Sequence, residues 1–503
     1  MSRWSYLPRV RRHVVAASRW SGLPRFLSTH SSSVQHVRVP CASAGHITVS
    51  LHNISNHDRS TPLVIVLPPF SLPETSSVNQ LPSCFQDHPV AVINYRWQGQ
   101  KPKGDEQPDY PLHWPTPLHD VSFGYSWIME NLGSGTDELA KPRPAYVYGS
   151  YLGASLAASL ALTESYHTIL PRPMTVRGLM LFNGIYNWTM FLPDHPVQKS
   201  RTMSEVESGL ARDPIEEEGI FTDLKRLTPS LFAKPSNLFD PFASACLFFH
   251  SPDLYEPDDF TTPLSASSTS RHGEGIEMDA QEEEETADEL LARAAQLAKQ
   301  KKPLHKGHRI FPPYRSTLCL PQALFLYSSP SPWHWTHPSL AGSSSDISDG
   351  GSNRRRVTLN KNSFAVQASE LSGLMLRSLY MHELLEYRGG GRGMAGLLSL
   401  PWEEEGITED DLTEEQQEWK REVDSRVRTL RVSRPSPPSP SSFSPSSSFM
   451  IPLEESLRLD ENAERVMSSW LADKIDEDLA REEEGRGRGG DGDLAEWFAS
   501  LKL

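Results

Sequence analysis

The sequence predicts an α/β fold with a mainly parallel central sheet flanked by helices. Short apolar runs that end at Pro, Gly or Asn are typical of buried strands. These runs alternate along the chain with segments of helical period, which is the pattern of βαβ units. The expected strands are residues 62–67, 91–95, 145–148, 176–182, 322–327 and 380–387.

Two helices are predicted between these strands. Residues 119–132 place Val121, Tyr125, Ile128 and Leu132 three or four positions apart, which indicates an amphipathic helix. Residues 153–163 are rich in Ala, Leu and Ser, and such small side chains let a helix lie close to a sheet. The short turn before this second helix is framed by Gly149 and Gly153.

Size, charge and cysteine content limit the possible classes of protein and of partner. A chain of 503 residues with 37% hydrophobic content can form one large core, while 31 Gly and 41 Pro predict long loops or disorder. The net charge of −15 argues against nucleic acid as a partner, except for contact at Arg354–Arg356. Cys41, Cys84, Cys246 and Cys319 are far apart, which predicts reduced thiols. We expect no cofactor, no metal and no transmembrane span.

The amino-terminal segment has the composition of a mitochondrial transit peptide. No Asp or Glu occurs before Asp58, and the segment is rich in Ser. The alternative is a disordered basic tail. Residues 1–40 are therefore excluded from the expected fold, with cleavage near residue 27 and the mitochondrial matrix as the expected location. The basic residues that carry this prediction are Arg3, Arg9, Arg11, Arg12, Arg19 and Arg25.

Composition divides the remainder into four parts. The expected parts are an α/β domain at 41–400, an acidic helical segment at 401–432, a Ser/Pro linker at 433–449 and amphipathic helices at 450–503. Disordered insertions are expected at about 265–302 and 343–356. The glutamates at 282–285 fit a solvated face, since no His stands at ligand spacing beside them.

The carboxyl-terminal end carries two apolar helical faces. The first, within residues 459–479, comprises Leu459, Ala463, Val466, Met467, Trp470, Leu471, Ile475 and Leu479. The second comprises Leu494, Trp497, Phe498 and Leu501, at the anchor spacing of a helix that lies in a groove of another protein. The alternative is that this last helix covers an apolar patch of its own chain.

Several phrases, taken in order, resemble a known family. They are AVINYRW at 91–97, DPFASACL at 240–247, LPQALFLY at 320–327 and YRGGGRGM at 387–394. Together with the turn between Gly149 and Gly153, they resemble the hormone-sensitive-lipase type of α/β-hydrolase, also called the α/β-hydrolase fold-3 group. The resemblance covers about residues 45–395. It implies an α/β-hydrolase fold and a carboxylesterase-like reaction.

The residues that this reaction needs are not at the matching positions. Such hydrolases use a Ser at the centre of G-x-S-x-G, a catalytic acid and a His, with backbone donors for the oxyanion. The central position is Tyr151, and Ser150 stands one place earlier. The acid position falls near Ser331 and the His position at Arg392. The glycine-rich oxyanion loop corresponds to residues 67–70, which contain two prolines.

Other polar residues are weaker candidates. His113, His119, His334 and His337 could serve as a base, but ordinary surface roles are more common for such residues. Asp346 and Asp349 could replace the acid, although they lie in a Ser- and Gly-rich stretch.

The first functional hypothesis is therefore a mitochondrial α/β-hydrolase-fold protein that has lost catalysis and acts by binding a protein or a ligand. The alternative is an active carboxylesterase or lipase-type serine hydrolase that uses Ser150 and an unidentified His. A third interpretation is an interaction subunit of a larger mitochondrial assembly.

Overall fold

The structure, a computed structural model, describes residues 34–70, 81–97, 112–134, 141–166, 172–192, 195, 220–250, 264, 309–313, 316–329, 362–387, 414–433 and 459–488. The chain divides into two units, Met1–Ser33 and Val34–Leu503, and every described residue belongs to the second.

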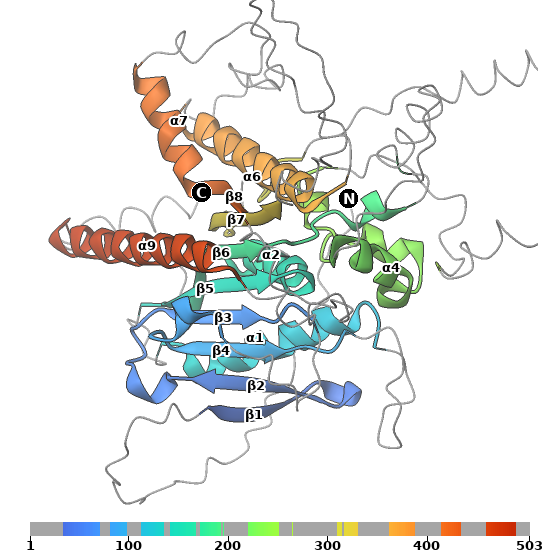
Figure 1. Cartoon of the computed structure of the whole chain (residues 1–503). Coiled ribbons are helices and arrows are strands. Elements are labelled where there is room, and N and C mark those ends of the chain that lie inside the picture. The colour runs from blue at the N-terminus through green and yellow to red at the C-terminus, as the bar shows by residue number, and fades with distance from the viewer. Residues whose placement is uncertain are drawn as a thin grey trace, which may run out of the picture. The chain divides into compact units, whose positions relative to one another are not determined.

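The described residues form one eight-stranded sheet of order β1-β2-β4-β3-β5-β6-β7-β8 (Figure 1). β1 and β2 pair antiparallel, and β2 pairs antiparallel with β4. All pairings from β4 to β8 are parallel. The strands are β1 Gln35–Pro40, β2 His46–His52, β3 Leu63–Leu67, β4 Val90–Asn94, β5 Arg143–Ser150, β6 Met174–Phe182, β7 Gln322–Ser329 and β8 Val427–Ser433. The predicted mainly parallel sheet is confirmed.

Five of the six predicted strands are confirmed as β3 to β7, and the sixth is wrong. Residues 380–387 are the last turns of helix α6 (Phe364–Tyr387). The apolar run there continues a helical spacing through the buried Leu371 and Met375, and a short apolar run alone does not distinguish a strand from a buried helix.

Three strands were not predicted, and two of them move the expected domain limits. β1 contains Gln35–Pro40, so the last residues assigned to the leader at 1–40 lie in the sheet. β8 pairs with β7 over seven residue positions, so the sheet extends beyond the expected limit at residue 400. β8 follows directly on helix α7 (Glu414–Arg426) and carries Arg428 and Arg431, which hid its strand pattern.

Helices α1 (Thr116–Leu132) and α2 (Leu152–Glu164) cover one face of the sheet, and both were predicted. A Cβ on Gly149 of β5 would lie 2.7 Å from Ala157 of α2, so this glycine allows a close approach. Gly124 brings α1 equally close to Ile93 of β4. α6 lies on β7 and β8, with α7 beside it (Figure 1).

Helix α9 (Glu461–Arg488) covers the opposite face, where Tyr146 and Tyr148 project. The Trp470 ring meets the Tyr146 ring edge-on at 6.5 Å, and the Tyr146 hydroxyl donates to Asp478 at 2.7 Å. The predicted apolar face of residues 459–479 is largely buried against the chain's own sheet, although Leu479 remains 51% exposed. None of the described helices is both long and apolar enough to cross a membrane.

The four cysteines are free. Burial, followed by the charge of Asp120, raises the pKa of the Cys41 thiol to about 11. Burial, followed by the charge of Glu464, raises the pKa of the Cys84 thiol to about 12. Neither thiol is a thiolate near neutral pH, so neither is an activated nucleophile.

Candidate functional site

The candidate site is the sharp turn between β5 and α2, at the carboxyl end of the central strand. Tyr151 occupies the tip of this turn, with φ 51° and ψ −114°. A positive φ is rare for a bulky residue and costs on the order of 1–3 kcal/mol. The spacing of Gly149 and Gly153 therefore predicted the position of the turn and its central residue correctly.

The two framing glycines are required by the geometry. A Cβ on Gly153 would lie 2.3 Å from the carbonyl oxygens of Leu67 and Pro68. A Cβ on Gly149 would lie 2.4 Å from the Gly153 carbonyl oxygen. Both distances are far below van der Waals contact, so the turn closes only with glycine at both positions.

The Tyr151 side chain is buried among other aromatic rings. The residue is 2% exposed. The ring centroids of Phe70, Phe182 and Phe364 lie 6.1, 5.9 and 5.7 Å from that of Tyr151. These three rings come from the loop after β3, from β6 and from α6, so an aromatic cluster occupies the tip of the turn.

An amide binds the Tyr151 hydroxyl. Asn183 Nδ2 lies 3.3 Å from the Tyr151 hydroxyl oxygen and 2.8 Å from Ser328 Oγ. Asn183 Oδ1 accepts the backbone N–H of Ser328 at 2.8 Å, which fixes the amide to the end of β7. An amide cannot take up a proton near neutral pH as a general base does. Asn183 was not predicted, although Asn is a residue that tolerates its φ of 48°.

The backbone donors at the turn have partners within the chain. In α/β-hydrolases the oxyanion hole uses the N–H after the nucleophile and an N–H from the loop after β3. Here the N–H of Leu152 donates to the Pro69 carbonyl at 3.1 Å. Pro68 and Pro69 have no N–H, and the Pro68 carbonyl accepts the Tyr95 hydroxyl at 2.7 Å. The prolines noted in the sequence therefore place a carbonyl where the hydrolase needs a donor.

Ser150, the alternative nucleophile, is not at the tip. It is the last residue of β5, is 3% exposed, and projects from the same face as Tyr148, away from α2. Tyr148 packs against Phe85 at 5.2 Å. Burial raises the pKa of the Tyr148 phenol, and the neighbouring Ser150 hydroxyl opposes this rise.

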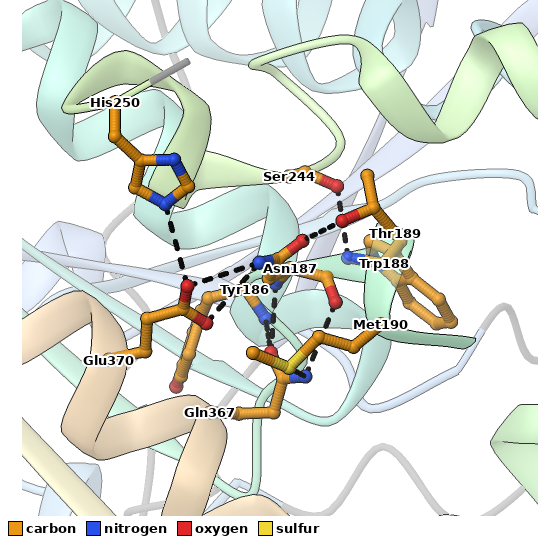
Figure 2. A network of polar contacts seen from close by, with 9 residues as sticks. All are labelled: Tyr186, Asn187, Trp188, Thr189, Met190, Ser244, His250, Gln367 and Glu370. Carbon is orange, nitrogen blue, oxygen red and sulfur yellow. Dashed lines mark hydrogen bonds and ion pairs between the residues drawn. The ribbon is translucent and has the colours of Figure 1, made fainter. Parts of the chain in front are cut away.

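A buried polar network holds α6, and with it Phe364, against the turn. Figure 2 shows Gln367 and Glu370 pointing from α6 towards Asn187. Gln367 Oε1 accepts the backbone N–H groups of Tyr186 and Asn187 at 2.9 and 2.8 Å. Gln367 Nε2 donates to the Asn187 carbonyl at 3.2 Å. Asn187 Nδ2 donates to both carboxylate oxygens of Glu370 at 3.2 and 3.3 Å.

The same network contains a histidine–carboxylate pair. His250 Nε2 lies 3.4 Å from Glu370 Oε1, with the His250 side chain 2% exposed (Figure 2). No local pattern predicts this pair, because 120 residues separate its members. In the described part of the chain, no group of three His, Cys, Asp or Glu side chains is arranged to hold a metal ion.

The remaining residues predicted for the site add little to its geometry. His113 is half-buried, with Nδ1 2.9 Å from the Trp114 carbonyl oxygen, and His119 is exposed on α1. The segment 387–394, matched to the His position, begins at the last residue of helix α6 and otherwise lies outside the described part. The other residues and segments singled out in the sequence lie outside the described part. They are Ser331, Arg392, His334, His337, Asp346, Asp349, the segments 282–285 and 354–356, and Leu494, Trp497, Phe498 and Leu501.

Comparison with solved structures finds esterases. The chain is similar to an esterase of Pyrobaculum calidifontis at 18% identity and a TM-score of 0.28, covering 42% of this chain and 61% of the esterase. It is similar to EstE1, a carboxylesterase cloned from a metagenomic library, at 21% identity and a TM-score of 0.28, covering 44% and 66%. Carboxyl esterase 2 of Tuber melanosporum matches at 14% identity and a TM-score of 0.31, covering 60% and 70%.

Comparison with protein-family models gives no match, and neither does comparison with curated proteins. The sheet order, the parallel central strands and the turn after β5 are those of the predicted α/β-hydrolase fold. The fold resemblance seen in the sequence is thus confirmed, and the similarity to the esterases adds no information about substrate.

Proposed function

We propose that this α/β-hydrolase-fold chain does not hydrolyse esters and acts by binding a protein or a ligand. One observation carries the proposal: the residue at the tip of the turn is a buried Tyr151, and the next N–H, on Leu152, is bonded to the Pro69 carbonyl. A nucleophile must be accessible and near a base, and an oxyanion needs donors that are free to receive it. At this turn the tip side chain is buried, and among the described donors the Leu152 N–H is already bonded within the chain.

The order of residues in the chain limits the candidate bases. In α/β-hydrolases the nucleophile, the acid and the His follow one another in the sequence. Beyond the end of β7 the chain contains three His, and the last of them is His382 on helix α6. No His occurs in the last 121 residues, which include α7, β8 and α9.

Ester turnover by the full chain is the test. Wild type and Ser150→Ala should both hydrolyse short p-nitrophenyl esters at the rate of buffer alone. Turnover by folded wild type that Ser150→Ala abolishes would establish the alternative, a serine hydrolase that uses Ser150.

The proposed location is the mitochondrion. The support is the absence of Asp and Glu before Asp58 together with the interleaved arginines. Residues 1–40 fused to a fluorescent protein should direct it to mitochondria. A matched fusion with Arg3, Arg9, Arg11 and Arg12 replaced by Gln should remain diffuse, and a diffuse wild-type fusion would contradict the proposed location.

A further inference from the structure

Strand β8 forms an edge of the sheet. It pairs with β7 on one side, and no described strand pairs with it on the other. An edge strand presents a row of backbone N–H and C=O groups, which can pair with an extended segment of another chain. At seven residues, β8 is long enough for such an addition.

The exposed side chains of β8 are basic, with an apolar residue between them. Arg428, Leu430 and Arg431 are exposed, with Leu430 41% exposed. The register with β7 puts Arg428 and Leu430 on one face of the strand and Arg431 on the other. Neither arginine makes an ion pair with a described residue. β8 contains no Asp or Glu, although the chain as a whole has a net charge of −15.

We propose that the outer edge of β8, where no described strand pairs, binds an extended acidic segment of a partner protein, which adds a strand to the sheet. Backbone hydrogen bonds would supply affinity, and side chains opposite the exposed residues would supply specificity. The partner segment would place carboxylates opposite Arg428 and Arg431, with an apolar residue opposite Leu430. This inference rests on the proposed binding function and assigns it a surface and a partner chemistry.

Charge favours such a partner over a second copy of this chain. Two β8 strands that pair antiparallel about Leu430 would place Arg431 of one copy diagonally opposite Arg431 of the other. Like charges directly opposite are destabilising, and diagonal positions are still within reach of long side chains such as Arg. A carboxylate of a partner at that position would be attracted to Arg431.

The probe is a fluorescein-labelled peptide, Val-Glu-Val-Thr-Glu-Val, which aligns its two Glu with Arg431 and Arg428 when it pairs antiparallel. Its control has both Glu replaced by Gln. Fluorescence anisotropy with the full chain should show saturable binding of the acidic peptide. The Gln peptide should bind about tenfold more weakly, since it loses both exposed charge pairs with the arginines. Added salt should weaken binding of the acidic peptide.

Two variants separate this edge from general charge effects. Arg428→Glu/Arg431→Glu should weaken binding of the acidic peptide at least about tenfold. Arg421→Glu, at an exposed position on α7, should leave the affinity unchanged. Hydrogen exchange should show that the peptide protects the backbone amides of β8 in the wild type.

Several results would overturn the proposal: no binding by wild type, equal binding of the Gln peptide, an equal loss in Arg421→Glu, or no protection of β8. A dimer in sedimentation that Arg428→Glu/Arg431→Glu dissociates would assign the edge to a second copy. None of these results bears on ester turnover, so the proposed loss of hydrolysis is tested separately.

Discussion

Gly153→Ala should lower the free energy of unfolding by about 3 kcal/mol or more, because overpacking against backbone is poorly relieved. The added Cβ would lie 2.3 Å from two backbone carbonyl oxygens, those of Leu67 and Pro68. A flexible side chain could move aside, whereas these carbonyls belong to the end of β3 and to the loop that carries Pro69. Denaturant unfolding followed by circular dichroism measures the change.

Gly373→Ala is the matched control. Gly373 lies within α6, and a Cβ there would meet nothing within 4 Å. Alanine in a helix interior is favoured over glycine by about 0.5–1 kcal/mol, so this variant should be as stable as the wild type or more stable. Equal effects of the two substitutions would contradict the described geometry of the turn.

Asp120→Asn should destabilise the fold by about 3–5 kcal/mol, because it removes one partner of a buried ion pair. The Asp120 side chain is 1% exposed. Its Oδ2 accepts the backbone N–H and the Nε of Arg96, both at 2.9 Å, and its Oδ1 accepts Nη2 at 2.6 Å. Arg96 Nη1 also donates to the Ala44 carbonyl at 2.6 Å, so the pair ties α1 to the turn between β1 and β2.

An exposed pair provides the comparison for this substitution. Asp223 and Arg226 on α4 (Ile220–Phe232) lie 3.7 Å apart, with side chains 53% and 62% exposed. Asp223→Asn should change the free energy of unfolding by less than about 1 kcal/mol. If Asp120→Asn is equally mild, the Arg96–Asp120 pair does not hold the amino-terminal strands in place.

The central part of the fold was predictable because its local signals agree. β3 is a continuous apolar run, β4 is apolar up to its last residue, and β6 ends in the apolar run 179–182. β5 leads directly into the glycine-framed turn and the small-residue helix α2. β1 and β2 gave weaker signals, since polar residues such as His36 and Arg38 alternate with the apolar ones. Their position in an acid-free segment also favoured a targeting sequence.

Only the part of the candidate site that depends on spacing along the chain was predictable. Spacing placed Tyr151 at the tip of the turn and Ser150 before it. The bond from Leu152 to Pro69 and the contact of Tyr151 with Asn183 join segments that no local pattern connects. The same holds for the bonds of Gln367 and Glu370 to Asn187, which lies about 180 residues away along the chain.

The most direct measurement of the central claim is labelling with a fluorophosphonate probe, which reacts covalently with an activated serine. Full-length wild type, Ser150→Ala and Tyr151→Ser would be compared, each shown to be folded. The account predicts no labelling of any of them, including Tyr151→Ser, since the described groups beside the tip are the Asn183 amide, which is no base, and a Leu152 N–H that is already bonded. Labelling of wild type that disappears in Ser150→Ala would contradict the account and establish a working serine hydrolase.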